Sequence, residues 1–329
     1  MEKTIIVLYN INGKMMYMNE LEIIIPAYNA HSTIIKTLDS IKIQKDLPKY
    51  HITIVNDFST NYVDVINNYK QYLNIDEIIT KENIGPGGAR QYGVDNTESK
   101  YIVFIDSDDY FENETSIIDL YNEIEKSNAD LVISNFIYER DNIRVVKEHN
   151  PVWLHGKIYR RSFLDKHNIR FNYTRANEDN GFNSLIFLLN PILVFLDKIT
   201  YVYSENSESI TRKDNRLYKF TGLEWYAYNI NWAIEEAEKR NVSEKSLAIK
   251  SISGLSVMYH SYLDLFDEYD VSKILKWSIP LYLKYLKYQE IADTYEQQAL
   301  NLEEFKGNEK VKNSNIPFSE FKEKINRLL

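Results

Sequence analysis

The sequence predicts an α/β fold, in which a mainly parallel sheet is flanked by helices and followed by a helical C-terminal region. Two observations predict it. Over the first half of the 329-residue chain, short apolar runs alternate with segments whose apolar residues recur at helical spacing. After about Arg216 only the helical spacing remains. Because strands that alternate with helices are joined by right-handed crossovers, we expect them to run parallel in one sheet.

The elements can be assigned in order along the chain. Asn12-Gly13 is a typical two-residue hairpin turn, so residues 4–18 are expected to form a β-hairpin. The expected strands that follow are 22–26, 51–56, 77–80, 101–105 and 131–138. The expected helices are 31–43, 62–73, 87–94 and 115–126. The first helix is expected to pack on the sheet through an apolar face formed by Ile34, Ile35, Leu38 and Ile41.

The C-terminal third is expected to be helical and to pack against the α/β part, because no Gly/Ser linker separates them. Its core candidates are Trp225, Ile230, Ile234, Leu255, Met258, Leu263 and Leu265. Residues 281–288 alternate Leu and Tyr with Lys, which suits either a membrane surface or a packing and oligomerisation helix. The acidic balance of the chain favours the second interpretation, and with it a homo-oligomer formed through the C-terminal helices.

Composition excludes several classes of protein. The formal net charge of -9 argues against a nucleic-acid partner. The absence of Cys excludes disulfides, thiolate metal sites and a cysteine nucleophile. No apolar run approaches the roughly 20 residues of a membrane helix, and the apolar stretch 5–9 is too short for a signal peptide. These features predict a cytoplasmic protein, with a peripheral position at the inner membrane face as the alternative.

An acidic cluster follows the apolar strand 101–105 directly. Asp106, Ser107, Asp108 and Asp109 would stand at the carboxyl end of a buried strand, where open α/β sheets bind ligands. Clustered carboxylates repel one another unless a cation neutralises them, and hard oxygen ligands favour Mg²⁺ or Mn²⁺ beside substrate phosphates. The alternatives are a solvated loop or a helix cap, since Asp109 could cap the helix that follows.

Two other strand ends carry suitable polar groups. Pro26, Ala27, Tyr28 and Asn29 end the first strand, where Tyr28 offers an aromatic face to a planar base. Asp57 ends the second strand and can accept a hydrogen bond from N3–H of uracil, although a helix N-cap is an equally simple role for it.

A glycine-rich turn supplies a third group. It begins at Asn83, and its three glycines and one proline lead into a helix N-terminus, a place suited to anions. Arg90 lies one helical turn further on and is a candidate partner for phosphate or carboxylate. The turn is neither a Walker A loop nor a dinucleotide fingerprint.

These four segments together resemble family 2 glycosyltransferases, which have the GT-A fold, invert the anomeric centre and use nucleotide-sugars. The matching sequences lie at 25–29, 55–60, 83–90 and 104–109. The resemblance implies that Ala27, Tyr28, Asp57, Asn83 and Arg90 surround the uridine. It also implies that Asp106 lies near the ribose and that Asp108 holds Mn²⁺ or Mg²⁺ on the diphosphate. One departure is Asn56-Asp57-Phe58, where the family usually has two acids followed by Gly.

Three later segments extend the resemblance. Residues 152–161 resemble a block under the sugar site, which makes Lys157 a candidate donor-binding residue. Trp153 could equally well lie against the sugar ring or in the core. His155 could contact the substrate, although a lone His near Gly is more often structural. Glu178-Asp179 resembles the family's Glu-Asp motif, which implies that Asp179 is the catalytic base beside Glu178. Without the upstream motifs, both acids would be read as helix N-terminal acids that complement the dipole.

The third of these segments, residues 203–212, resembles a loop from which Arg212 could close over the diphosphate. The resemblance divides the chain into a catalytic domain over 1–212 and a helical region over 213–329. Within the catalytic domain, residues 20–110 would bind the nucleotide and residues 111–212 the acceptor.

The resulting prediction is a metal-dependent, inverting transferase. It would move a hexose or N-acetylhexosamine from a UDP-sugar to a glycan, teichoic-acid-like or lipid-linked acceptor. Two alternatives remain, a nucleotidyltransferase and a binding protein whose site has decayed. The first turn, Pro26 to Ala30, lacks the basic signature of the former, and the full set of acids argues against the latter.

Overall fold

Contacts within the chain divide it into two compact units. The computed structural model describes residues 8–9, 15–16, 19–141, 143–204, 215–267, 269–302, 305 and 307–329. Unit 1 comprises Met1–Arg170 and Pro191–Glu205, and unit 2 comprises Phe171–Asn190 and Asn206–Leu329. The predicted boundary at residue 212 lies outside the described residues and stays a prediction.

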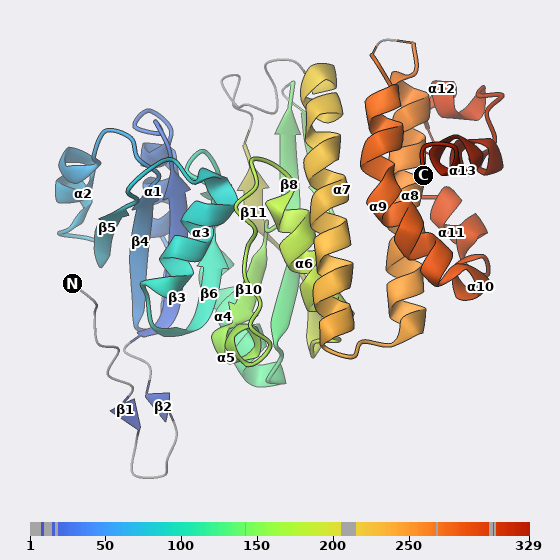
Figure 1. Ribbon diagram of the computed structural model, residues 1–329. Coiled ribbons are helices and arrows are strands. Elements are labelled where there is room, and N and C mark those ends of the chain that lie inside the picture. Colours follow the sequence, from blue (N-terminus) through green and yellow to red (C-terminus); the bar gives the residue numbers. More distant parts are fainter. Residues whose placement is uncertain are drawn as a thin grey trace. The chain divides into compact units, whose positions relative to one another are not determined.

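Unit 1 is built around a nine-stranded sheet (Figure 1). Its strands are β3 (Asn19–Ala27), β4 (Tyr50–Asn56), β5 (Ile75–Ile79), β6 (Ser99–Phe104), β7 (Tyr110–Phe111), β8 (Leu131–Arg140), β9 (Ile143–Lys147), β10 (Lys157–Arg160) and β11 (Leu193–Tyr203). The order is β5-β4-β3-β6-β10-β8-β11-β7, with β9 on β8. The strands β3 to β6 pair in parallel, as predicted, whereas β10 lies antiparallel between β6 and β8.

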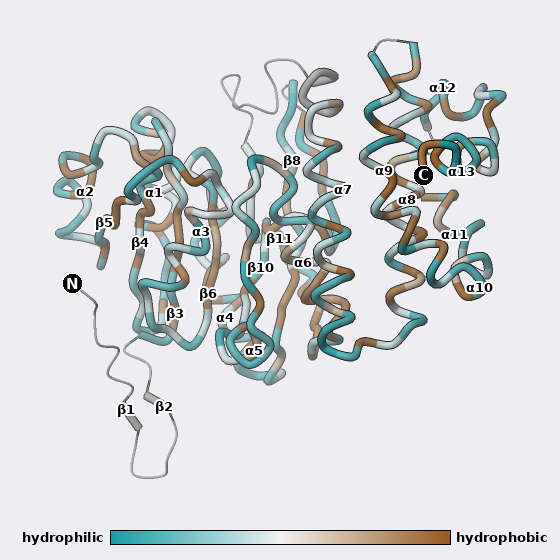
Figure 2. The backbone as a smooth tube through the Cα atoms, viewed as in Figure 1, coloured by the Kyte–Doolittle hydropathy of each residue, from teal (hydrophilic) through white to brown (hydrophobic). Residues whose placement is uncertain are grey.

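Helices cover both faces of this sheet. They are α1 (Ile34–Lys42), α2 (Val63–Tyr69), α3 (Gly85–Asp95), α4 (Ser116–Ser127) and α5 (Arg161–Lys166). The odd-numbered apolar residues of β3 share one core with α1, α2 and α4. On the other face, a Cβ on Gly93 of α3 would stand 2.7 Å from Ile24, so glycine permits the close approach of α3 to β3. Apolar residues concentrate on the central strands (Figure 2).

Most predicted elements are present within a few residues of their expected ends. The apolar face of α1 is narrower than predicted, because Ile35 is 39% exposed while Ile34, Leu38 and Ile41 are buried. Within the expected hairpin, β1 (Leu8–Tyr9) pairs antiparallel with β2 (Met15–Met16). The rest of that hairpin lies outside the described residues.

Unit 2 is helical. Its helices are α6 (Glu178–Leu188), α7 (Asn215–Lys239), α8 (Glu244–Leu265), α9 (Ser272–Lys287), α10 (Gln289–Ala292), α11 (Glu296–Leu300), α12 (Glu309–Lys312) and α13 (Phe318–Asn326). A Cβ on Gly254 of α8 would meet Ile230 of α7 at 3.0 Å and Leu281 of α9 at 3.4 Å, so three helices converge there. The predicted core residues are buried, except that Trp225 is half-buried.

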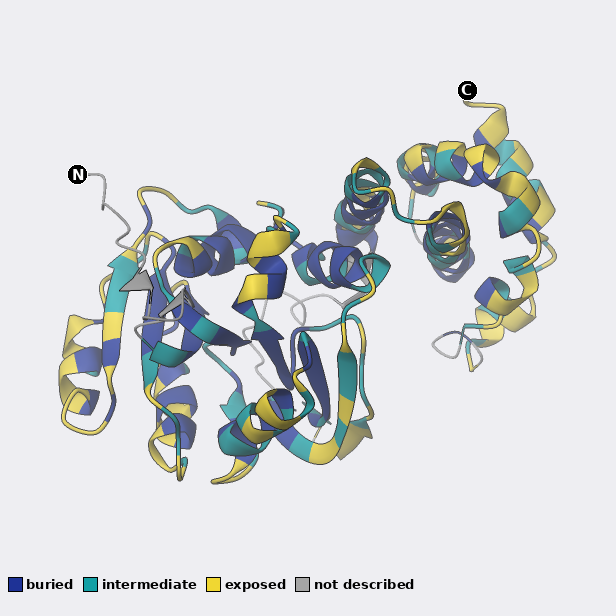
Figure 3. Cartoon of the chain, turned by 90° about the horizontal axis from the view of Figure 1, so that it is seen from below, coloured by how far each residue is buried: buried dark blue, intermediate teal, exposed yellow. Residues whose placement is uncertain are grey.

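Burial follows the layers within each unit. The central strands of unit 1 (β3, β4, β6 and β8) and the inner faces of its helices are mostly buried, whereas the outer helix faces are exposed (Figure 3). In α9, Leu281, Tyr282 and Tyr285 are buried within unit 2. No helix among the described residues has the length and the apolar character needed to cross a membrane.

Candidate functional site

The carboxyl ends of β3 and β4 form the first part of the site. Ala27 pairs with Asn56 across the two strands, and the Asp57 backbone N–H donates to the Ala27 carbonyl at 2.9 Å. Pro26 lies opposite Val55, one residue before the end of β3. Tyr28 follows and is 53% exposed, so its ring is available at this edge of the sheet.

Asp57 anchors the turn that opens α3. Its side chain is 3% exposed, and one oxygen accepts from the Ile84 N–H at 2.8 Å while the other accepts from the Gly85 N–H at 2.9 Å. The Thr80 hydroxyl donates to the same carboxylate at 3.2 Å, and Asn83 Nδ2 donates to the Asp57 carbonyl at 3.2 Å. A carboxylate has about four acceptor positions, so these bonds leave room for one more donor. The predicted contact to uracil stays a prediction.

An ion pair joins α3 to the acidic turn after β6. Arg90 Nη2 donates to Asp106 Oδ1 at 2.5 Å, and the side chains are 6% and 31% exposed. Burial alone would raise the pKa of Asp106, but the charges and hydrogen bonds of Arg90 and His155 together outweigh burial and hold that pKa below its usual value. The structure therefore brings together two residues that were predicted from separate motifs.

Asp109 is the most buried member of the acidic turn, with no exposed surface. Its carboxyl group accepts from the Tyr201 hydroxyl at 2.5 Å and from the Ser204 N–H at 2.8 Å. Burial raises its pKa well above the usual value, and the charges of Asp108 and Asp106 act in the same direction. Asp109 thus connects the acidic turn to the end of β11 instead of capping a helix.

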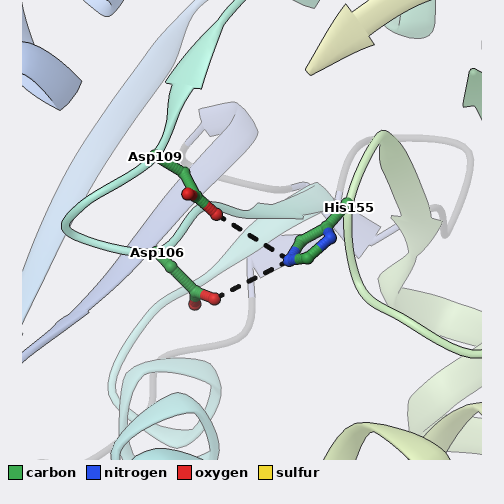
Figure 4. A group of neighbouring side chains, drawn as sticks. All are labelled: Asp106, Asp109 and His155. Carbon is green, nitrogen blue, oxygen red and sulfur yellow. Dashed lines mark ion pairs between the residues drawn. The ribbon is translucent and has the colours of Figure 1, made fainter. Parts of the chain in front are cut away.

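His155 lies across from two of these acids (Figure 4). Its Nε2 is 3.9 Å from Asp106 Oδ2 and 3.8 Å from Asp109 Oδ2. The imidazole stacks on the ring of Tyr201 at 4.7 Å and on that of Tyr203 at 4.8 Å. Burial among these rings lowers the pKa of His155. The imidazole was expected to be structural, and its ring contacts agree with a packed side chain.

The acidic turn also has a group of atoms that suits a metal ion. One atom each from Asp106, Asp109 and His155 lie within 4.8 Å of one another. Carboxylate and imidazole are ligands that Mn²⁺ accepts, and carboxylates alone suit Mg²⁺. Asp108, the predicted ligand, is outside this group, but it belongs to the same turn and is half-buried, as is Ser107. The donor set of the turn therefore fits a divalent cation, and the choice of Asp108 stays a prediction.

The block before β10 contributes packing. Trp153 is half-buried, and its ring lies 5.6 Å from Phe136 and 5.7 Å from His155. Lys157 is 1% exposed, and its ammonium group donates to the carbonyls of Asn150 and Trp153. Lys157 therefore holds the loop that carries Trp153 and His155, and its predicted contact with the donor stays a prediction.

The predicted base belongs to unit 2. Glu178 and Asp179 form the first turn of α6, which Asn177 precedes in a left-handed conformation. Glu178 is buried and Asp179 is half-buried, with Asp179 Oδ1 accepting from the Asn180 N–H at 2.8 Å. Arg212 lies outside the described residues.

Tyr201 and Ser204 were not predicted as site residues. They lie on and just after β11, and Tyr201 is 92 residues from Asp109. The sequence shows only that they lie near the end of a late strand. The antiparallel pairing of β11 with β7 brings them to the acidic turn.

Comparison with known proteins agrees with this architecture. Residues 22–176 match the model of glycosyl transferase family 2. That stretch includes all of β3 except its first three residues, and every later segment up to the block around Lys157. Residues 22–176 are a family 2 glycosyltransferase domain.

The relatives of this domain include named glycosyltransferases. Glycosyltransferase GlyA of Streptococcus pneumoniae is 26% identical over 282 residues, which is 74% of this chain and 40% of that protein. The poly(ribitol-phosphate) beta-glucosyltransferase of Bacillus spizizenii is 31% identical over 191 residues, covering 51% of this chain and 30% of that protein. The chain therefore spans less than half the length of these relatives.

A solved structure shows the same fold. The crystal structure of residues 1–349 of S. aureus TarS in complex with UDP-GlcNAc superposes with a TM-score of 0.66. The match covers 94% of this chain and 91% of that one, at 18% identity. The glycosyltransferase domain thus has the GT-A fold.

Proposed function

We propose that the protein is an inverting glycosyltransferase that moves a hexose or N-acetylhexosamine from UDP to a hydroxyl group of a surface polymer. One observation supports this most. Within unit 1, Tyr28, Asp57, Arg90 and Asp106 all lie where β3, β4, β6 and α3 present their ligand-binding ends. Direct hydrogen bonds join Asp57 to the start of α3 and Arg90 to Asp106.

The uridine half of the donor would be bound by stacking and by hydrogen bonds. The exposed ring of Tyr28 offers a stacking surface for the base. Asp57 would accept the uracil N3–H with its remaining lone pair, and cytosine has no such proton. Asp106 would contact the ribose, and the hydrogen bond from Arg90 would fix the orientation of the Asp106 carboxylate.

The acidic turn would serve the diphosphate. Asp108 would hold Mn²⁺ or Mg²⁺, and a bound divalent cation supplies charge that stabilises the departing phosphate. Asp109 and His155 shape the turn from the buried side, since Asp109 is tied to Tyr201 and Ser204. Arg212 is proposed to cover the diphosphate.

Asp179 would act as the general base, with Glu178 beside it. An acid in the first helical turn is stabilised in its ionised form by the helix dipole, so it can accept a proton at neutral pH. As the acceptor oxygen bonds to the anomeric carbon, its proton passes to Asp179 and the bond from that carbon to UDP breaks. Attack from the face opposite UDP inverts the anomeric centre.

The acceptor is proposed to be a polyol-phosphate polymer of the teichoic-acid type. The proposal rests on the relatives, one of which is a poly(ribitol-phosphate) beta-glucosyltransferase. A hydroxyl of such a polymer has a pKa far above neutrality, so it needs the general base. Positioned proton transfer of this kind contributes on the order of a hundred- to ten-thousand-fold.

The test is a donor panel. The protein is incubated with Mn²⁺, poly(ribitol phosphate) and, in turn, UDP-glucose, UDP-galactose, UDP-GlcNAc, UDP-GalNAc or GDP-mannose, and nucleotide release is measured. We expect acceptor-dependent release of UDP from at least one donor. Asp179→Asn should lower that rate about a hundredfold or more while UDP affinity changes little. Asp197→Asn is the control, because Asp197 is 90% exposed and should leave the rate unchanged.

Other outcomes decide among the alternatives. Release of diphosphate from a nucleoside triphosphate and a sugar phosphate would identify a nucleotidyltransferase. UDP binding without release from any donor, even with Mn²⁺, would identify a decayed binding protein. Normal turnover by Asp179→Asn would remove Asp179 from the base role.

A further inference from the structure

Phe58 has an unusual backbone conformation for its residue type. Its φ angle is +62°, in the left-handed region. Every other non-glycine residue with positive φ in the described part of the chain is Asn, Asp or His, which tolerate this region because their side chains bond locally. Phe58 has no such side chain, so its conformation is strained.

Burial of the Phe58 side chain does not offset this strain. The Phe58 side chain is 59% exposed, although a phenyl ring in water forgoes the apolar contacts that usually stabilise it. Strained residues of this kind concentrate at ligand sites, where the surrounding structure holds them in place. The position of Phe58 therefore decides whether its ring has a use.

Phe58 stands beside the proposed base site. Asp57 directly precedes it, and the Asp57 N–H donates to the carbonyl of Ala27, which directly precedes Tyr28. Tyr28 is 53% exposed. Two exposed aromatic residues thus follow the ends of two adjacent parallel strands, one directly after Asp57 and the other directly after its backbone partner Ala27.

The two loops that carry these rings are fixed to each other. The Ala30 N–H donates to the Tyr62 hydroxyl at 2.8 Å in a buried bond. The His31 ring stacks on that of Tyr62 with centroids 4.2 Å apart, and one of its nitrogens lies 2.9 Å from the Asn61 carbonyl. The backbones under Tyr28 and Phe58 are therefore held in a set relation before any ligand arrives.

We propose that Phe58 is a second aromatic wall of the nucleobase site, so that the base of the donor is held between Tyr28 and Phe58. The inference rests on the proposed function and adds a residue to its donor site. A planar base has two apolar faces, and each face that stacks on an aromatic ring adds affinity with little regard to base identity. Asp57 would supply the preference for uracil, and the two rings would supply most of the affinity for the base.

Phe58→Gly tests this directly, because glycine adopts positive φ without strain. We expect its melting temperature to equal or exceed that of the wild type. Its dissociation constant for UDP, measured calorimetrically with Mn²⁺, should rise about tenfold, as expected for the loss of one stacking partner. Its affinity for inorganic diphosphate with Mn²⁺ should not change, since diphosphate has no base.

Two further variants complete the test. Tyr72→Gly is the matched control, because Tyr72 is an equally exposed aromatic residue (54%) that precedes β5 at the other edge of the sheet. It should leave UDP affinity unchanged. Phe58→Asn keeps a residue suited to positive φ and should weaken UDP binding as Phe58→Gly does, which secures the result if one variant folds poorly.

The outcomes separate the two proposals. If wild type and Phe58→Gly bind UDP equally well, the second wall is wrong and the proposed function is untouched. If Phe58→Gly and Phe58→Asn both lose affinity for diphosphate as well as for UDP, Phe58 supports the loop and does not contact the base. That result also overturns the inference. If the wild type binds no UDP, both proposals fail together.

Discussion

Two buried aspartates at the same edge of the sheet, Asp57 and Asp109, are held in different ways. Asp57 accepts two backbone N–H groups from one short turn, at 2.8 and 2.9 Å. Asp109 accepts from Tyr201 and Ser204, which are more than 90 residues away, and shares its own turn with Asp106 and Asp108. The first carboxylate organises a loop, whereas the second lies at the centre of a charge cluster. The same residue type thus anchors a single turn at one position and, at the other, connects segments that lie far apart in the sequence.

Replacing Asp57 should have the largest effect. Asp57→Ala leaves the N–H groups of Ile84 and Gly85 buried without an acceptor, and each unsatisfied group is destabilising. We expect the free energy of unfolding, measured in urea, to fall by about 3 kcal/mol. UDP binding should be lost as well, because the start of α3 loses its anchor. An unchanged unfolding midpoint would show that water replaces the carboxylate.

Breaking the Arg90–Asp106 ion pair should have the next largest effect. Arg90→Met leaves Asp106 without its compensating charge, and we expect a loss of about 2 kcal/mol, since Asp106 keeps some solvent contact. Adding Asp106→Asn in the same chain should recover part of that loss. A double variant less stable than Arg90→Met would mean that Asp106 has another partner that matters more.

The substitution Asp109→Asn should destabilise the protein only slightly. Burial and the two neighbouring carboxylates already penalise the charge of Asp109, so a neutral amide of the same shape removes a repulsion while it keeps the bond from Ser204. We expect a change in unfolding free energy below about 1 kcal/mol, against a clearly larger loss for Asp57→Asn. Equal losses in the two variants would contradict the distinction drawn between the sites.

The smallest effect concerns His51, on the β4 strand away from the site. Its hydrogen bond to the buried carboxylate of Glu22 raises the pKa of His51, against the opposing effect of burial. A raised histidine pKa gives stability that is complete below the unfolded value of about 6.5 and is lost as pH rises through the folded value. Between pH 5.5 and 8.5 the wild type should lose a few tenths of a kcal/mol relative to His51→Gln, because solvent screens the pair. Parallel pH profiles would count against it.

Periodicity predicted the parallel half of the sheet well because its information is local. The strands β3, β4 and β6 each contain a mainly apolar stretch that is buried, and the intervening helices show their apolar faces in sequence. The strands β10 and β11 gave a weaker signal. The four-residue β10 contains Lys157 and Arg160, and Asp197 and Lys198 interrupt the apolar residues of β11.

The site divides in the same way. Tyr28, Asp57, Arg90 and Asp106 could be named in advance because each follows a recognisable strand or opens a helix. The two carbonyl partners of Lys157 could not be named from its motif, because they are set by the fold of the loop around Asn150 and Trp153. The strain at Phe58 likewise could not be predicted, because the sequence shows only a Phe after Asp57 and not its φ angle.

The order of strands and helices, and the acids and aromatics that follow each strand, were determined by the sequence itself, since hydrophobic period and strand ends are properties of neighbouring residues. Only the tertiary structure decided that Tyr201 and Ser204 complete Asp109, that β10 enters between β6 and β8, and that His155 faces two aspartates. Those relations join residues dozens of positions apart, and the pairing that brings them together depends on the packing of the whole sheet.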